Sequence, residues 1–328
     1  MKFILQLIAA VFSYISVPAQ TVNQDSATGN VYALLVGISK YSDPDIPPLQ
    51  FADRDAVVFA DFLQSKAGGS VPKDNIRLLT NANASTAAVT MAIKWLVRTC
   101  KKGDLVFFYF SGHGDLESIT MFNQAYLICY NTPVESYESM SLSVNYLNDI
   151  AFTLSAKTGA NVVLITDACH SGKMADSKVN ELVGQQLMAS KAKEIRIASC
   201  KADQLSNEKT DWGGGRGVFS YYLVNGLKGL ADQSNDGIVS LGEIKNYLQS
   251  SMANDPVLRQ ENKIQIPVLK GNDDFTLAKA DAEELIKARQ LSAVDSVSMA
   301  MLAAAPFPAD DLPEDPEDYF RELLKKES

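Results

Sequence analysis

The chain has 328 residues, 46% of them hydrophobic, which is enough to bury one large core or two modest ones. Its formal net charge is -9 and it contains no block of basic residues, so the composition excludes the electrostatic pattern of a nucleic-acid-binding protein. Four cysteines in a chain of this length are too few for a disulfide scaffold.

The first predicted element is a targeting segment. A positive start precedes an apolar stretch over residues 3–17 and a small-residue site that ends at Ala19. We expect residues 1–19 to be a signal peptide and residues 20–30 to be a polar leader, so that the mature protein is exported to the periplasm or secreted. A buried first helix is the alternative. No later stretch has the run of about 18 apolar residues that a membrane span requires, so no span is expected in the mature chain.

Strand and helix patterns then alternate along residues 31–275, which predicts an α/β domain with a parallel sheet. Apolar runs predict strands at Val31–Ile38, Asn75–Leu79, Leu105–Phe110, Asn161–Thr166, Glu194–Ser199 and near Ile264–Leu269. Amphipathic stretches predict helices at Asp53–Gln64, Thr86–Arg98, Val144–Leu154, Gly217–Leu227 and Leu241–Met252. A small hairpin is expected near residues 126–130. Residues 276–328 are predicted to form a helical and acidic C-terminal tail.

Both histidines of the chain lie in tight motifs, and each motif follows an apolar strand candidate. In an open parallel sheet, ligands bind beyond the carboxyl ends of the strands, so two reactive groups placed there can share one crevice. A cysteine nucleophile needs a base that accepts its proton near neutral pH, and imidazole has a suitable pKa. Cys169 and His113, 56 positions apart, are therefore predicted to form a catalytic dyad. The motifs are Ser111-Gly112-His113-Gly114-Asp115 and Asp167-Ala168-Cys169-His170-Ser171-Gly172.

The remaining histidine and cysteines are weaker candidates for this chemistry. His170 directly follows Cys169, and neighbouring side chains near a strand end point in different directions, so His113 is favoured as the base. The other thiols lie at the end of a predicted helix or in apolar runs, which favours buried, unreactive groups over disulfide partners. These thiols are Cys100, Cys129 and Cys200.

The runs Tyr109–Gly114 and Asp167–Gly172 resemble the motifs of the caspase and metacaspase superfamily of cysteine peptidases. In caspases the histidine lies about 50 residues before the cysteine. The likeness extends from about Val31 to about Lys270, as in a bacterial caspase-like domain protein. It implies a caspase-like three-layer sandwich, with a mostly parallel sheet of about six strands flanked by helices. It also implies a cysteine endopeptidase that acts on proteins or peptides and requires no cofactor.

The same resemblance implies roles for individual backbone groups. The backbone N–H groups of Gly114 and Cys169 would bind the oxyanion that forms when the thiolate attacks a peptide carbonyl. His113 would then protonate the leaving amine.

The substrate pocket is expected to be acidic. Asp167 stands two residues before Cys169, where the caspase pattern has glutamine, and a carboxylate there favours a substrate Arg or Lys. Metacaspases also carry an acid at this place and cleave after basic residues. The resemblance further assigns Asp55 and Ser111 to the pocket, with Asp203 as an additional member. The alternative for Asp55 is a stabilising charge near a helix N-terminus.

Two residues depart from the metacaspase pattern or weaken it. Asn131 stands where metacaspases often have an aspartate, which removes one acid from the pocket or from the family's calcium site. Lys201 lies close to Asp203 in the sequence and would offset its charge.

A second motif suggests calcium. Six residues occupy positions 1, 3, 5, 7, 9 and 12 of an EF-hand-like loop, with a serine at the third position and a predicted helix on each side. The alternative is a turn at residues 235–237 followed by a helix that accepts an acid in its first turn. The six residues are Asp232, Ser234, Asp236, Ile238, Ser240 and Glu243.

Three functions are compatible with these residues. The first is an exported Cys-His endopeptidase that cleaves after Arg or Lys. The second is a catalytically idle caspase-like module that binds other proteins. The third is a calcium-regulated peptidase. The presence of both dyad residues and of the glycine after His113 favours the first.

Overall fold

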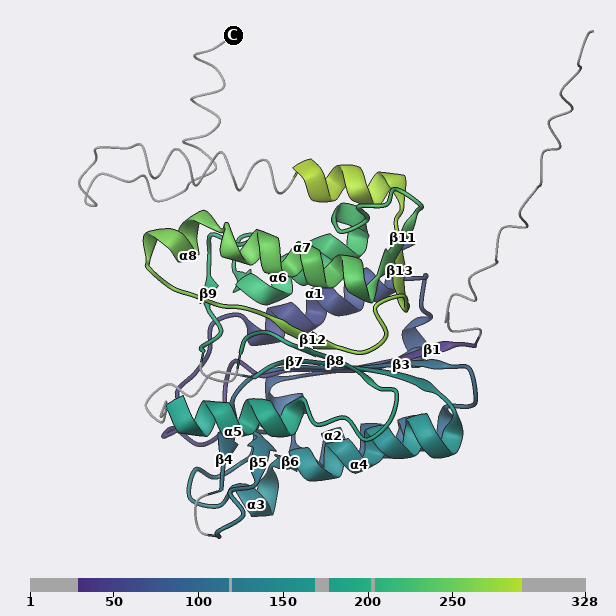
Figure 1. Ribbon diagram of the computed structural model, residues 1–328. Coiled ribbons are helices and arrows are strands. Elements are labelled where there is room, and N and C mark those ends of the chain that lie inside the picture. The colour runs from purple at the N-terminus through teal and green to yellow at the C-terminus, as the bar shows by residue number, and fades with distance from the viewer. Residues whose placement is uncertain (1–28, 118–119, 169–176, 202–203, 291–328) are drawn as a thin grey trace, which may run out of the picture.

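The computed structural model describes residues 29–117, 120–168, 177–201 and 204–290. Its centre is a six-stranded sheet with the order β12-β8-β7-β3-β1-β2 (Figure 1). Neighbouring strands are parallel except for β12, which runs antiparallel to β8. The predicted fold class is therefore confirmed. The strands are β1 (Val31–Gly37), β2 (Ile76–Thr80), β3 (Leu105–Ser111), β7 (Asn161–Asp167), β8 (Ile195–Ala198) and β12 (Val268–Lys270).

Helices cover both faces of the sheet and complete a three-layer sandwich (Figure 1). Because both faces are buried, the strands are continuous apolar runs instead of alternating ones. All seven residues of β3 are buried, and successive side chains enter opposite cores. One face is covered by α1 (Ala52–Gln64), α6 (Val218–Asn225) and α7 (Leu241–Ala253), and the other by α2 (Thr86–Thr99), α4 (Val144–Phe152) and α5 (Ser177–Leu187).

Serine side chains begin several of these helices. Ser85 caps α2 by accepting the Ala88 N–H, as its position before an amphipathic stretch predicts. Ser240 begins α7 in a capping box, in which Glu243 reaches back to the Ser240 N–H. Such caps satisfy N–H groups that have no partner inside the helix, and they determine where each helix starts.

The remaining elements are short and lie around this sandwich. The predicted hairpin near residues 126–130 is part of a three-stranded sheet, β4-β5-β6, beside the histidine loop. At the start of the predicted C-terminal tail, residues 276–279 form strand β13 and not a helix, because Leu277 and Ala278 pack in the core. A helix follows at residues 282–290. The short elements are β4 (Gly114–Leu116), β5 (Ala125–Leu127), α3 (Tyr137–Met140), β6 (Leu142–Ser143), β9 (Glu208–Lys209), β10 (Arg216–Gly217), β11 (Ile238–Ser240), α8 (Pro256–Gln260) and β13 (Thr276–Lys279), with 3-10 turns at Lys73–Asn75 and Asn81–Asn83 and π-helical turns at Thr153–Thr158 and Gly226–Leu230.

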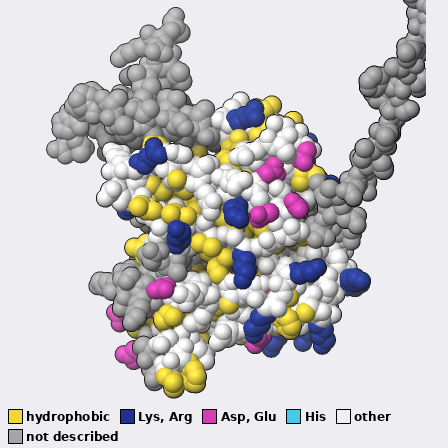
Figure 2. All heavy atoms as spheres, viewed as in Figure 1, with side chains coloured by type: hydrophobic (Ala, Val, Ile, Leu, Met, Phe, Trp, Pro, Cys, Tyr) yellow, Lys and Arg dark blue, Asp and Glu magenta, His cyan; other side chains and the backbone are white. Residues whose placement is uncertain are grey.

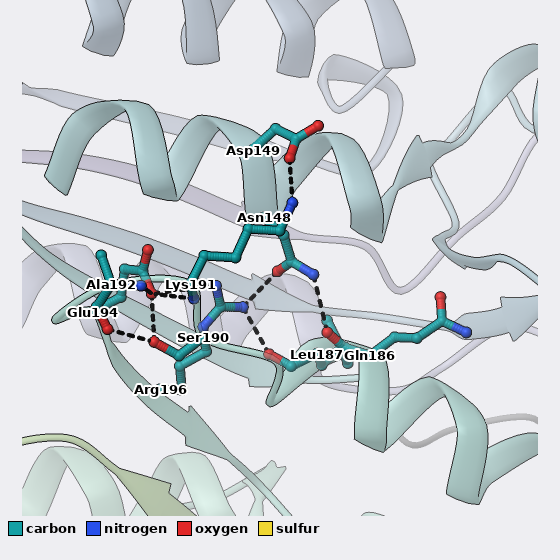
Figure 3. A network of polar contacts seen from close by, with 9 residues as sticks. All are labelled: Asn148, Asp149, Gln186, Leu187, Ser190, Lys191, Ala192, Glu194 and Arg196. Atoms are coloured by element: carbon teal, nitrogen blue, oxygen red, sulfur yellow. Dashed lines mark hydrogen bonds and ion pairs between the residues drawn. The ribbon is translucent and has the colours of Figure 1, made fainter. Parts of the chain in front are cut away.

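A buried polar network lies on the α4 and α5 side of β8 (Figure 3). Arg196 is 1% exposed, and its Nη1 donates to Asn148 Oδ1 at 2.6 Å and to the Leu187 carbonyl at 2.8 Å. Glu194 is also buried and accepts a hydrogen bond from Ser190 Oγ at 2.5 Å. Its Oε2 lies 3.8 Å from Arg196 Nη2. The network joins β8 to α4 and to the loop that follows α5.

The surface carries charges of both signs. Figure 2 shows one face of the molecule, on which hydrophobic side chains gather in small patches between basic and acidic ones. Within the part of the chain that the structure describes, no helix has both the length and the hydrophobicity needed to cross a membrane.

Candidate active site

His113 lies two residues beyond the end of β3 and is 5% exposed. Its backbone N–H donates to the Tyr41 hydroxyl at 2.8 Å, and the two rings pack with their centroids 5.1 Å apart. The imidazole Nε2 lies 2.8 Å from the Pro47 carbonyl oxygen. A carbonyl can only accept, so Nε2 carries the proton and Nδ1 is the basic nitrogen of the neutral ring. The Pro47 carbonyl therefore selects the tautomer that a proton acceptor needs.

The two sequence motifs meet at the carboxyl ends of β3 and β7. These strands pair in register, with Ser111 opposite Asp167, and the Gly112 N–H donates to the Asp167 carbonyl at 3.1 Å. A Cβ atom added to Gly114 would lie 2.7 Å from the Ala168 carbonyl oxygen, so only glycine permits this approach. The structure thus places the histidine loop directly against the residue that precedes Cys169. Cys169, His170 and Asp203 lie outside the described residues.

Two of the predicted pocket acids lie close together and are each 1% exposed. Asp55, in the first turn of α1, accepts a hydrogen bond from Arg216 Nε at 2.5 Å and from the Gly217 N–H at 3.1 Å. Asp167, the last residue of β7, accepts from Ser206 Oγ at 2.5 Å. A Cβ on Gly217 would lie 3.0 Å from Asp55 Oδ2 and 3.1 Å from Asp167 Oδ2. Gly217 therefore sits between the two carboxylates.

Burial dominates the electrostatics of these acids. It raises the pKa of Asp55 to about 7, because desolvation and the nearby Asp167 charge outweigh the attraction of the Arg216 guanidinium. Burial also raises the pKa of Asp167, against the hydroxyls of Ser206 and Ser199, which favour the charged form. The two carboxyls are close enough to influence each other's ionisation, so the pair titrates as a unit.

Two other predicted residues are placed by the structure. Ser111 is buried at the end of β3, beside Gly37 of β1 and Asp167 of β7. Asn131 lies at the start of α2, where its Oδ1 accepts the Thr86 N–H at 2.9 Å. An aspartate oxygen would accept the same bond, so this contact does not explain the departure from the metacaspase pattern.

The buried thiols behave as the sequence predicts. Cys100, Cys129 and Cys200 are all buried. Burial raises the pKa of Cys100 to about 12 and that of Cys129 to about 11, so these two stay protonated at neutral pH.

The EF-hand-like loop has its carboxylates turned to its own backbone. Asp232 Oδ2 accepts the Gly237 N–H at 3.0 Å, and Glu243 accepts the N–H groups of Ser234 at 3.1 Å and Ser240 at 3.0 Å. Across residues 29–117, 120–168, 177–201 and 204–290, no three side chains of the His, Cys, Asp and Glu types are grouped as metal ligands. These hydrogen bonds are those of a turn and a helix cap, and calcium binding by this loop stays a prediction.

Several contacts of the site were not predicted from the sequence. Tyr41 and Pro47 come from the loop after β1, 66 or more positions from His113. Arg216 and Ser206 reach the acids from segments beyond β8. Three glycines, Gly213 to Gly215, precede Arg216, and in the sequence such a run predicts only a flexible loop near the cleft.

Residues 30–276 match the family model of the caspase domain. The chain belongs to the caspase family. This confirms the resemblance on which the sequence interpretation depended.

Individual relatives are distant. The chain is 29% identical to metacaspase-2 of Arabidopsis thaliana over 160 residues, which is 45% of this chain and 36% of that protein. It is 32% identical to a probable protease of a Desulfuromonadales bacterium over 111 residues, covering 30% of this chain and 13% of that protein. The chain therefore spans well under half the length of these relatives.

Solved structures show the same fold. A Geobacter sulfurreducens protein superposes with a TM-score of 0.52 at 19% identity, covering 78% of this chain and 97% of that one. Caspase-1 from Spodoptera frugiperda also gives 0.52, at 12% identity, covering 79% of this chain and 96% of that one. At such identities the likeness establishes the architecture alone.

Proposed function

We propose that this chain is a cysteine endopeptidase that cleaves peptide bonds through Cys169 and His113 and prefers Arg or Lys before the cut bond. One observation carries the proposal. The glycine after His113 lies against Ala168, the residue that precedes Cys169, so the two motifs share one end of the sheet. Membership of the caspase family supports it independently.

The described residues support a specific division of labour. Nδ1 of His113 accepts the thiol proton, and the Pro47 carbonyl at Nε2 stabilises the imidazolium that forms. The thiolate attacks the peptide carbonyl, His113 returns the proton to the leaving amine, and water then hydrolyses the thioester. The Cys129 thiol cannot replace the nucleophile, because burial holds its pKa near 11.

The backbone of Gly114 suits the oxyanion role implied by the family. The His113 carbonyl accepts the Ile128 N–H, and Gly114 pairs with Leu127 of β5. In an antiparallel ladder this pattern makes Gly114 and Leu127 a pair without hydrogen bonds between them. The Gly114 N–H is therefore directed away from β5, to the side on which a substrate oxygen can accept its hydrogen bond.

Fluorogenic peptides that end in Arg, Lys or Asp test the proposal. We expect the wild-type protein to cleave the Arg or Lys peptide, and Cys169→Ala and His113→Ala to lower kcat by about a thousand-fold or more. Cys129→Ala and His170→Ala are the matched controls and should keep most of the activity. If folded wild-type protein cleaves none of the peptides, the idle binding module becomes the better explanation.

The same assay tests regulation by calcium, and a mass measurement tests export. A rate that rises on addition of calcium and falls with Asp232→Ala would establish the calcium-regulated alternative. We propose export from the first 19 residues, and the N-terminal mass of protein expressed with its leader tests it. A mature chain that begins at Gln20 is expected, whereas an intact Met1 in the exported fraction would contradict a cleaved signal.

A further inference from the structure

The substrate pocket proposed above already contains a positive charge. Arg216 is 6% exposed, and its Nε donates to Asp55 Oδ1 at 2.5 Å while its Nη2 donates to Ser220 Oγ of α6 at 2.6 Å. The next residue, Gly217, lies within van der Waals reach of both pocket carboxylates. A guanidinium of the protein itself thus holds one of the two acids that a basic substrate side chain would seek.

We propose that Arg216 is a specificity-determining residue, which sets the net charge of the pocket as the internal counter-ion of Asp55. This inference rests on the proposed function, because it concerns the pocket of the same site. Above the pKa of Asp55, where both acids are ionised, Asp55 and Asp167 supply two negative charges and Arg216 offsets one. A substrate Arg or Lys is then recognised by a single net charge, and the comparison below is made at such a pH. Without Arg216 the preference would be stronger, and without Asp55 it would be weaker.

Arg216 is held in place by its surroundings. It follows three glycines with positive φ, Gly213 to Gly215, which carry the chain through a turn that other residues rarely adopt. The Arg54 guanidinium donates to the carbonyls of Gly213 and Gly214. Both contacts attach this turn to α1, the helix that carries Asp55.

A second clamp acts on the neighbouring strand. Glu208 pairs with Gly217 in the β9-β10 ladder, and its carboxylate accepts the N–H groups of Gln50 at 2.8 Å and Phe51 at 2.9 Å. The segment that carries Arg216 is thereby tied to the N-terminal end of α1. Such support keeps the guanidinium beside Asp55 when a substrate arrives.

Four forms of the protein separate this role from a purely structural one. With Asp55, Asp167 and Arg216 charged, the wild type has a net pocket charge of one negative unit. Asp55→Asn reduces it to zero, Arg216→Gln doubles it, and the double variant restores it. Substitution of a residue that only supports the fold would change kcat/KM for all substrates by the same factor. Substitution of a counter-ion changes the ratio of kcat/KM between charged and uncharged substrates.

The measurement is kcat/KM for two peptides that end in Arg or in citrulline, which has nearly the same shape without the charge. Relative to wild type, we expect the Arg-to-citrulline ratio to rise about ten-fold in Arg216→Gln and to fall about ten-fold in Asp55→Asn. The double variant should return close to the wild-type ratio. Arg196→Gln, which changes a buried arginine on the opposite face of the sheet, is the control and should leave the ratio unchanged.

If Arg216→Gln alone does not fold, the step from Asp55→Asn to the double variant tests the same counter-ion role and should raise the ratio. Equal ratios in the folded forms would overturn the role of Arg216 while leaving the peptidase intact. Binding of the uncleaved peptides to the same variants in a Cys169→Ala background, measured by calorimetry, gives an independent result. If the peptide affinities follow the predicted order but no form that keeps Cys169 cleaves the peptides, the role of Arg216 in binding is supported and the peptidase activity is rejected. If the affinities are equal, the role of Arg216 in binding is rejected.

Discussion

Two arginines are buried beside carboxylates on opposite faces of the sheet, and they are held differently. Arg216 makes a direct hydrogen-bonded ion pair with Asp55 at 2.5 Å, near the ends of β3 and β7. Arg196 lies 3.8 Å from Glu194 and donates its hydrogen bonds to neutral oxygens of α4 and of the end of α5 (Figure 3). Its Nε and Nη2 are buried without a hydrogen-bond partner among the residues described.

The difference indicates that Arg196 has a structural role, whereas Arg216 acts as a counter-ion. Around Arg196, neutral partners tie α4 and the end of α5 to β8. Around Arg216, two acids and one base are packed against the glycine loops of the proposed site. The Arg216 charge opposes the rise that burial causes in the pKa of both acids, and the Asp167 charge adds to the rise at Asp55. Perturbed pKa values of this kind cluster at functional sites, because the chemistry of those sites requires them.

The largest effect is expected from Asp55→Asn. It leaves the Arg216 guanidinium buried without its counter-ion, and a guanidinium cannot release its proton, so we expect a loss of about 3–5 kcal/mol in the free energy of unfolding. Arg216→Gln should cost less, because Asp55 can bind a proton when its partner is gone. Denaturant unfolding at pH 7 measures both. Equal losses in the two variants would show that the pair is not electrostatically coupled.

Arg196→Met is expected to have a smaller effect. It removes two hydrogen bonds but also two unpartnered donors, so we expect a loss of about 1–3 kcal/mol. The same denaturant titration provides the comparison. A loss larger than that of Asp55→Asn would reverse the distinction between the two arginines.

A pH dependence of the free energy of unfolding also distinguishes the two faces. The pKa of Asp55 rises from about 3.8 in the unfolded chain to about 7 in the folded one, so the folded state binds the proton more tightly. The resulting stability is present below about pH 4 and is lost as the pH rises through about 7. Asp167, whose pKa is also raised, acts in the same direction, while Arg216 opposes both.

Unfolding titrations between pH 4 and 8 measure this slope. We expect the decline in stability to be shallower in the Asp55→Asn and Arg216→Gln double variant, which lacks the titrating carboxyl, and unchanged in Arg196→Met. An unchanged slope in the double variant would exclude Asp55 as its source.

The strands of the sheet were predictable within one to four residues of their ends. They are apolar on both faces, and only the middle of a two-sided sandwich buries such a run completely. The cap at Ser85 was readable for a similar reason, because a cap acts within three or four residues. The C-terminal strand β13 was missed, since its pairing with β11 is a contact between distant segments.

The sequence by itself determined the alternation of strands and helices, because hydrophobic periodicity is a property of consecutive residues. It also determined the two motifs that follow β3 and β7, and their resemblance to caspase motifs implied the family and its sandwich. Only the tertiary structure decided that the Pro47 carbonyl contacts His113, that Gly217 lies between Asp55 and Asp167, and that Arg216 pairs with Asp55. The Arg216 and Asp55 partners are 161 positions apart. Pairing across such a separation depends on how the layers pack, and no local pattern of side chains encodes it.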